Sequence, residues 1–254
     1  MSHRTHPLLC RQLPVVIALG LLLHALALIG SPVTAQEDVT AVITRAAERM
    51  AKVQSFHFTV TTPRGKTQIT EQIELAGVEG DIQRPDRFRA SFTAKAAVVT
   101  LTVKVVGIGN KIWVTNPMAS EETYIEVDGA EIVALPVTDL LNPDRLITAA
   151  VNLIENPEIA GEDKINGAQT THVKGTLDPR RIEELAGTPV PELTDIEPLD
   201  VSLWIDGEGL VVRAELTGRL TPSETGIIVR RLDLSNFDEP ITIEPPENVE
   251  TAGP

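Results

Sequence analysis

Several stretches of this chain place an apolar residue at every second position, and this alternation constrains the fold more than any other feature. The clearest stretch is RFRASFTAK, residues 87–95, where phenylalanine and alanine alternate with charged and small polar residues. Residues 55–61, 68–75 and 99–105 follow the same rule. Successive side chains of a strand point to opposite faces, so each stretch predicts a strand with one apolar and one polar face. Strands of this kind are typical of antiparallel sheets.

The alternation continues toward the end of the chain. Residues 111–115 follow a Gly109-Asn110 turn and predict another strand. Three more strands are predicted over residues 199–205, 210–220 and 226–237.

Three segments instead space their apolar residues three and four positions apart, as amphipathic helices do. The first covers residues 38–53 and leaves its charged residues on the opposite side. The second opens at Asn142-Pro143, a pair that suits the start of a helix, and ends near Asn156-Pro157. The third opens at Asp178-Pro179 and stops at Gly187.

About ten one-sided strands and three helices predict an α+β protein built on a large, curved antiparallel sheet, with helices covering its apolar face. So few helices would leave part of that face uncovered. A sheet that curls around an incompletely filled interior makes an apolar cavity. The alternative is a well-packed core without a cavity, and periodicity alone does not decide between the two.

The first 35 residues have the features of an export signal. Residues 1–12 are basic, and residues 13–29 form an apolar run without a formal charge. The small residues Val33-Thr34-Ala35 follow a Gly30-Ser31-Pro32 break, so cleavage after Ala35 is predicted. The alternative is a retained anchor, because the apolar run approaches the roughly 20 residues of a membrane span.

Residues 36–254 are then expected to form one domain outside the cytoplasm, secreted or associated with the cell envelope. The single cysteine, Cys10, precedes the apolar run, so this domain has no disulfide and no thiol. A lipidated cysteine should follow the run, and none does, which argues against lipid anchoring.

The charge of the chain excludes several classes of partner. The full chain has a formal net charge of −14. Without its first 35 residues, which hold two basic residues and no acid, 20 basic and 36 acidic residues remain. So acidic a surface repels phosphate backbones and anionic headgroups, and neither a nucleic-acid partner nor peripheral membrane adhesion is expected.

The remaining residues offer little for catalysis or for metal binding. His57 and His172 are isolated in the sequence, and no nucleophile elbow, zinc-protease helix or phosphate-binding glycine loop is present. Adjacent acids such as Glu121-Glu122 are typical of a solvated surface, although a glycosidase-like carboxylate pair stays open. Trp204 falls on a predicted polar face, where packing under a neighbour is favoured over lining an opening. We expect no enzyme, no metal and no cofactor.

A set of ordered segments carries a resemblance to a known family. Its most specific members are NPDRLITAAVNLIENP at residues 142–157, LWID at residues 203–206 and SNF at residues 235–237. Together with weaker segments they run in order over nearly all of residues 45–248. In this order they resemble the mycobacterial LppX/LprG-type lipoproteins, whose fold is similar to that of the LolA-type lipid carriers.

This resemblance implies a half-barrel sheet with helices on its concave face, enclosing an apolar cavity for acylated lipids. It offers no catalytic residue. The aliphatic strand faces agree with a lipid ligand, because acyl chains need a wide apolar lining and few polar groups. The cavity is expected to be lined by apolar residues of the strand faces and of the second helix: Phe56, Phe58, Ile73, Phe88, Phe92, Val99, Leu101, Val103, Val114, Leu146, Ile147, Ala150, Val151, Ile154 and Leu203.

Two functions from different classes follow from the sequence. The first is an extracytoplasmic, monomeric protein that carries or presents acylated lipids, with an envelope membrane protein as a further partner. The second is a ligand-free interaction or sensor module on the same fold, with its cavity filled. Lipid extracted from the purified protein would separate them.

Overall fold

A computed structural model describes residues 38–116, 119, 122–128, 151, 153–178, 180–181, 197–220 and 224–250. The chain divides into two compact units, residues 1–37 and residues 38–254. All described residues belong to the second unit. No helix among them is long and apolar enough to cross a bilayer.

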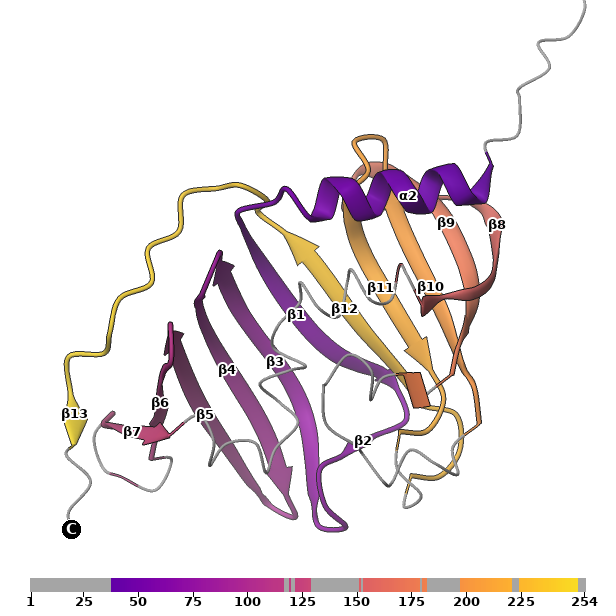
Figure 1. Ribbon diagram of the computed structural model, residues 1–254. Helices are drawn as coiled ribbons and strands as arrows, with labels where there is room; N and C mark the ends of the chain where they lie inside the picture. Colours follow the sequence, from indigo (N-terminus) through magenta and orange to yellow (C-terminus); the bar gives the residue numbers. More distant parts are fainter. Residues whose placement is uncertain are drawn as a thin grey trace, which may run out of the picture. The chain divides into compact units, whose positions relative to one another are not determined.

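The described strands form one large sheet, coloured in chain order in Figure 1. Its spatial order is β13-β7-β6-β5-β4-β3-β1-β12-β11-β10-β9-β8, with β2 paired to β3. Every pairing is antiparallel except that of β13 with β7. The strands are β1 (Ser55–Arg64), β2 (Thr67–Gln68), β3 (Ile73–Gln83), β4 (Arg87–Ala96), β5 (Val99–Ile108), β6 (Lys111–Thr115), β7 (Tyr124–Asp128), β8 (Glu155–Ile165), β9 (Ala168–Leu177), β10 (Leu199–Asp206), β11 (Val211–Thr217), β12 (Val229–Ser235) and β13 (Val249–Glu250).

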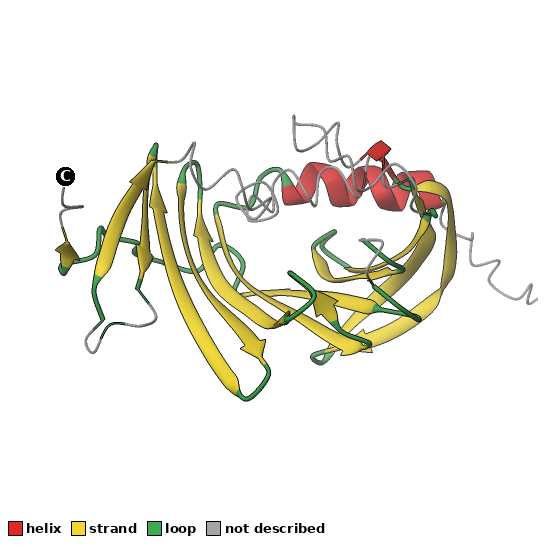
Figure 2. Cartoon of the chain, turned by 90° about the horizontal axis from the view of Figure 1, so that it is seen from below, coloured by secondary structure: helices red, strands yellow, loops and turns green. Residues whose placement is uncertain are grey.

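Helix α2 (Val39–Met50) lies across the part of the sheet formed by β8 to β12 (Figures 1 and 2). It begins where the side chain of Asp38 accepts a hydrogen bond from the backbone N–H of Thr40 at 3.2 Å, a common N-cap contact. Its buried residues, Val42, Ala46 and Met50, recur every four positions and join the hydrophobic core. The amphipathic spacing in the sequence is therefore confirmed for this helix.

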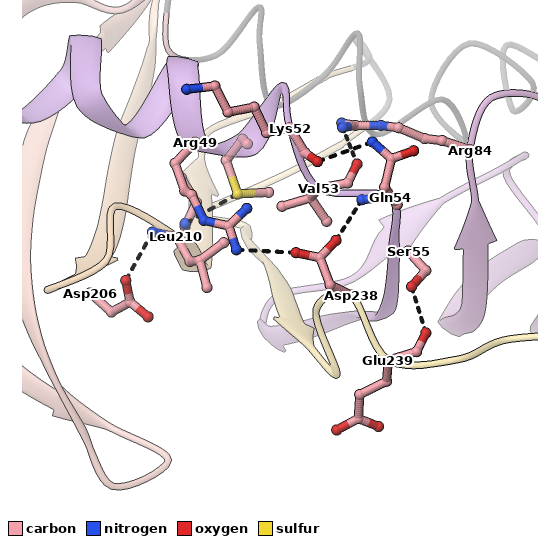
Figure 3. A network of polar contacts seen from close by, with 12 residues as sticks. Arg49, Lys52, Val53, Gln54, Ser55, Arg84, Asp206, Leu210, Asp238 and Glu239 are labelled. Atoms are coloured by element: carbon pink, nitrogen blue, oxygen red, sulfur yellow. Dashed lines mark hydrogen bonds and ion pairs between the residues drawn. The ribbon is translucent and has the colours of Figure 1, made fainter.

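Polar contacts fix the end of α2 to the start of β1 and to the segment after β12 (Figure 3). The carboxylate of Asp238 accepts hydrogen bonds from the backbone N–H of Gln54 at 2.7 Å and from Arg49 at 3.1 Å. The hydroxyl of Ser55 donates to the carbonyl of Glu239 at 2.6 Å. These contacts join residues more than 180 positions apart, so they tie the first described strand to the last part of the chain.

The end of the chain returns to the edge of the sheet that lies opposite β8. After β12 an extended segment leads to β13, which pairs parallel with β7, and the N–H of Tyr124 donates to the carbonyl of Asn248 at 2.8 Å. On the way, Arg87 donates to the carbonyl of Ile243 at 2.8 Å, and Ile243 is 2% exposed. The sequence analysis did not predict this return, because it depends on contacts between distant segments.

The coarse architecture agrees with the sequence analysis, with corrections. The strand predicted over residues 68–75 is wrong: β2 ends at Gln68, a tight turn follows, and β3 runs on to Gln83. The alternation misleads here because it continues through the turn, in which the N–H of Ile69 donates to the carbonyl of Ile73 at 2.9 Å.

A second correction concerns the predicted helix end near Asn156-Pro157. The chain is already in β8 at Glu155, and Asn156 has a φ of 49° at an irregularity in the pairing. An edge strand tolerates a proline at such a place. Val151 and Leu153 are helical and Ile154 is not. The earlier part of this predicted helix, and most of the helix predicted over residues 178–187, lie outside the described residues.

The large open antiparallel sheet and the α+β class are thus confirmed. Figure 2 shows the strands curving. Helices on a concave face and an enclosed apolar cavity stay predictions.

Candidate functional site

The strand residues predicted to line a cavity lie on one face of the sheet. Residues that are directly paired across an antiparallel ladder point to the same side. Phe92 pairs with Val103, and Val105 on the same strand pairs with Val114. Ala96 pairs with Val99 on one side and with Ile73 on the other. The register therefore joins β3, β4, β5 and β6 into a continuous apolar surface.

The same face continues through β1 into the strands below α2. Phe58 pairs with Leu234, and Leu232 on that strand pairs with Ala214. Ala214 in turn pairs with Leu203. Leu203 pairs with Val173 on β9, and Val173 pairs with Ile159 on β8. We call this surface, which extends across the sheet from β7 near one edge to β8 at the other, the apolar face.

Glycines make room for aromatic rings on the apolar face. Gly107 is paired with Phe88, and a Cβ at that glycine would lie 2.1 Å from the ring. Gly80 is paired with Phe58 in the same way, with the ring 2.9 Å from the position of a Cβ. Each ring lies over a neighbouring strand, which is a common reason for a glycine inside a strand.

Burial divides the apolar face into two regions. The α2 half, made of β1 and β8 to β12, is tightly packed: Phe56 is 0%, Phe58 4% and Leu203 1% exposed. Val151, which precedes β8, packs into the same core and is 3% exposed. In the β4–β7 half Ala90 is buried, but most of the larger apolar side chains on this face are only half-buried. There Leu101, Val103 and Val114 are only partly covered, and Val99 is 50% exposed.

The other predicted lining residues have the following places. Phe88, Phe92 and Ile154 are partly buried and pack against the core, and Ile73 is half-buried at the start of β3. Leu146, Ile147 and Ala150 lie outside the described residues.

Sequence reasoning missed part of the apolar face on β6 and β7. Ile112 pairs with Val127, and Val114 pairs with Ile125, so these half-buried side chains extend the surface beyond β5. The alternation in YIEVD, residues 124–128, was a signal for this strand. The stretch is only five residues long, and a short alternation is weak evidence for a strand.

The opposite face of the sheet is polar and held by ion pairs. Asp81 lies 2.9 Å from Nδ1 of His57 and accepts a hydrogen bond from Arg89 at 2.6 Å. Burial raises the pKa of Asp81, but the contacts with His57 and Arg89 outweigh it and hold the pKa below its ordinary value. On the same face, the guanidinium of Arg213 forms an ion pair with the carboxylate of Asp233 at 2.6 Å. Around these ion pairs the face has the chemistry of a solvated surface, whereas Trp113 and Trp204 are buried on it.

Trp204 lies on the polar face and is buried by its neighbours, as the favoured interpretation of the sequence predicted. It is 8% exposed, and its ring stacks on His172 with centroids 4.3 Å apart. Its indole N–H donates to Asp163 at 2.8 Å. Burial and the nearby charge of Lys174 lower the pKa of His172. The imidazole that stacks on Trp204 is therefore neutral at neutral pH.

A buried ion pair lies at one end of the apolar face. Arg230 pairs with Leu216 in the register, so it points to the apolar side, and it is 9% exposed. Its guanidinium contacts Glu224, which is 2% exposed, and donates to the carbonyl of Gly218 at 3.0 Å. Glu224 also accepts from the N–H of Leu220 at 2.7 Å. The two charges compensate each other, so this end of the face is polar without a net charge.

Two hollows of about 370 Å³ each occur among the described residues. The first lies beside the returning segment, between Arg89, Tyr124 and Ile243. The second lies where β3 begins and β4 ends, and is bordered by Ile73, Lys95 and Ala97. Across the described ranges, no three His, Cys, Asp or Glu side chains gather as metal ligands would.

Two curated proteins of Mycobacterium tuberculosis are similar in sequence. "Putative diacylated glycolipid transporter LprF" is 31% identical over 134 residues, which are 48% of this chain and 46% of LprF. The alignment thus spans about half the length of LprF. Lipoprotein LprA is 22% identical over 214 residues, which are 82% of each chain.

Two solved structures share the fold. LprF of Mycobacterium bovis matches with a TM-score of 0.58 and 22% identity, over 82% of this chain and 96% of that one. LppX of Mycobacterium tuberculosis matches with a TM-score of 0.54 and 19% identity, over 81% and 98% of the two chains. The model of the LppX_LprAFG lipoprotein family matches residues 38–243, which include nearly all of the sheet. This chain belongs to the LppX_LprAFG lipoprotein family.

Proposed function

We propose that this protein binds an acylated lipid on the β4–β7 half of its apolar face, and carries or presents that lipid at the cell envelope without catalysing a reaction. The ligand class is a lipid with aliphatic chains. Residues 1–35 act as its export signal, and the binding domain is extracytoplasmic.

The observation that carries this proposal is the partial burial of a continuous aliphatic surface. Leu101, Val103 and Val114 belong to one apolar face by register, yet each is only half-buried. Each methylene of an acyl chain that leaves water gains about 0.8 kcal/mol, so a chain of modest length could bind firmly there. Such a surface has few groups that could make directional hydrogen bonds, which favours selection by size and shape.

The similarity to LprF supports the same ligand class. The name of LprF refers to a diacylated glycolipid, and two acyl chains require a broad apolar surface. A surface that extends across β4, β5, β6 and β7 offers that breadth. The name also refers to transport, which is the role that we propose for this chain.

One observation favours the alternative of a ligand-free interaction module. In the α2 half, the protein itself fills the apolar face, because Phe56 and Leu203 are buried almost completely. If the β4–β7 half were filled in the same way, no room for a lipid would remain. The two proposals therefore differ in how the β4–β7 half responds to added volume.

The test is to add a large side chain to each half. In the β4–β7 half, Leu101→Trp should fit into space meant for acyl chain, so lipid bound per protein falls while the unfolding midpoint hardly changes. In the α2 half, the matched variant Leu203→Trp should overpack the core and cost about 1–3 kcal/mol or more.

Lipid is measured by extraction and mass spectrometry, and stability is measured by denaturant unfolding. A Leu101→Trp variant that is as unstable as Leu203→Trp, in a protein that holds no lipid, would leave the interaction module as the function.

A further inference from the structure

Several large apolar side chains are exposed in or next to turns at one end of the strands, the end where β4 connects to β5. That connection is at the lower end of the sheet in Figure 1. Val98, in the turn between β4 and β5, is 98% exposed, and Val99 beside it is 50% exposed. Ile69 is 45% and Ile227 is 53% exposed. We call these four residues the apolar rim. Single exposed apolar residues are ordinary, but a group of them at one place marks an interaction site.

The parts of the apolar rim are neighbours in space. Ile73 pairs with Ala96, which places the turn after β2 beside the turn that carries Val98. The second hollow joins the same two turns, with Gln72 on one side and Ala97 on the other. On the far side, a Cβ at Gly65 would lie 3.0 Å from the carbonyl of Ile227. The rim therefore extends from β5 across β4, β3 and β1 to β12.

The turn between β4 and β5 has an unusual composition. Tight hairpin turns favour asparagine, aspartate and glycine, because these residues adopt a positive φ easily. Here the two residues are alanine and valine, and Ala97 has a φ of 51°. The chain thus keeps a strained alanine and a fully exposed valine where polar turn residues would fold more easily. Folding does not explain this choice.

The charge around the rim differs from that of the whole protein. The chain has a net charge of −14. Among the described residues around the rim, the exposed cations number four, and they stand against Glu71 and Glu74, of which Glu74 is paired with Lys66 at 2.8 Å. Glu224 also lies beside the rim, but Arg230 neutralises it. The cations are Arg64, Lys66, Lys95 and Arg219. Because salt screens charges beyond about 8 Å, a surface that touches the rim meets these cations rather than the acids elsewhere.

We propose that the apolar rim docks onto an anionic lipid bilayer. Val98 and its apolar neighbours enter the boundary between headgroups and acyl chains, and the surrounding cations face the anionic headgroups. The inference rests on the proposed lipid-binding function, since docking places one end of the apolar face at a lipid source. It also limits the sequence-based exclusion of membrane adhesion, which considered the net charge alone.

A fluorophore at the rim tests this docking. An environment-sensitive dye is attached to Val98→Cys in the full chain with Cys10→Ser, which removes the native cysteine. The matched control carries the dye at Val249→Cys, a valine that is 39% exposed on β13, outside the rim. Because the dye reports its own surroundings, the readout is local even if residues 1–35 also associate with the vesicles.

Vesicles of phosphatidylcholine mixed with phosphatidylglycerol are added, and vesicles of phosphatidylcholine alone serve for comparison. We expect the dye at position 98 to shift its emission to the blue and brighten several-fold with the mixed vesicles. The response should be weaker with phosphatidylcholine alone and weaker again after Lys95→Glu. The dye at position 249 should not respond.

An unchanged dye at position 98, or an equal response at positions 98 and 249, would overturn the docking proposal. An equal response with both kinds of vesicle would overturn its electrostatic part. Lipid that co-purifies with the same preparations is measured in parallel. If lipid co-purifies but the dye at position 98 does not respond to vesicles, only the docking proposal is refuted. If the dye responds but no lipid co-purifies, only the proposed function is refuted.

Discussion

The α2 half and the β4–β7 half of the sheet share one rule of sequence and differ in how their apolar face is covered. Both alternate apolar and polar residues. In the α2 half, Val173 and Ile205 are 0% exposed, whereas Leu101 and Val103 in the β4–β7 half are only half-buried. Alternation therefore determines which face of a strand is apolar, and a separate element determines whether that face becomes core.

The length of α2 limits how many strands the helix can cover. A helix of 12 residues is about 18 Å long at 1.5 Å per residue. Neighbouring strands lie about 4.8 Å apart, so such a helix spans about four strands. That reach covers most of β8 to β12, the strands over which α2 lies, and leaves the β4–β7 half beyond it. The proposed lipid would supply the apolar contacts that α2 cannot make.

The largest expected effect concerns the buried ion pair at the end of the α2 half. Glu224→Ala would leave the buried guanidinium of Arg230 without its counter-charge. Removing one partner of a buried pair typically costs about 3–5 kcal/mol. Denaturant unfolding at neutral pH measures the loss. A cost below about 1 kcal/mol would show that water reaches Arg230, and that this end of the face is less packed than its exposure indicates.

The next effect compares the same truncation in both halves. Leu203→Ala should cost about 3 kcal/mol, because Leu203 is 1% exposed and its removal leaves a cavity. Leu101→Ala should cost about 1 kcal/mol, because Leu101 is already partly in contact with solvent. Both are measured as changes in the free energy of unfolding, with lipid removed beforehand. Equal costs would mean that the two halves are packed alike.

A smaller effect is expected where α2 is tied to the last part of the chain. The backbone N–H of Gln54 and the guanidinium of Arg49 hold the pKa of Asp238 below its ordinary value. A lowered pKa means that the stabilisation is complete at neutral pH and is lost as the pH falls below about 3.8 through the folded-state pKa.

Asp238→Asn keeps a residue that tolerates the φ of 58° found there and removes the charge. It should cost about 1 kcal/mol at pH 7, since the site is partly exposed and screened. The difference from the wild type should shrink as the pH falls toward 3, which unfolding at a series of pH values would show. A difference that is constant with pH would assign the effect to the hydrogen bonds rather than to the charge.

The smallest effect is expected for an exposed ion pair of the β4–β7 half. Glu122→Ala removes the partner of Lys104, and both side chains are about half exposed. Exposed pairs contribute little, so the loss should be below about 0.5 kcal/mol. Set beside Glu224→Ala, this variant shows how strongly burial changes the value of a single ion pair. A loss as large as that of Glu224→Ala would contradict the burial assigned to the two pairs.

The sequence predicted local structure well where one strand or helix contains the whole signal. The alternation over residues 87–95 and 99–105 and the spacing over residues 38–53 each matched an element of the structure. Prediction failed where the hydrophobic pattern was ambiguous, or where the structure depends on pairing with a segment far away in the sequence. The turn after Gln68 carries apolar residues, the edge strand β8 has polar residues on both sides, and β13 pairs with a strand more than a hundred residues away.

The candidate site was predicted as a set of residues but not as a surface. Alternation identified Phe92, Leu101 and Val114 separately, whereas their alignment on one face depends on the register between strands, which the sequence analysis did not assign. The sequence also could not show that Phe56 and Leu203 pack under α2 while Leu101 does not. That difference depends on where the helix docks, and it changes which of the predicted residues we now propose as ligand contacts.

The most direct test of the account is to identify what occupies the apolar face of the purified protein. The full chain is produced in a bacterium with acyl lipids, purified without detergent, extracted with organic solvent and analysed by mass spectrometry against a protein of similar charge. We predict an acylated lipid in near-stoichiometric amount, lost selectively in Leu101→Trp. A folded protein that yields no lipid above the control would contradict the lipid-carrier account.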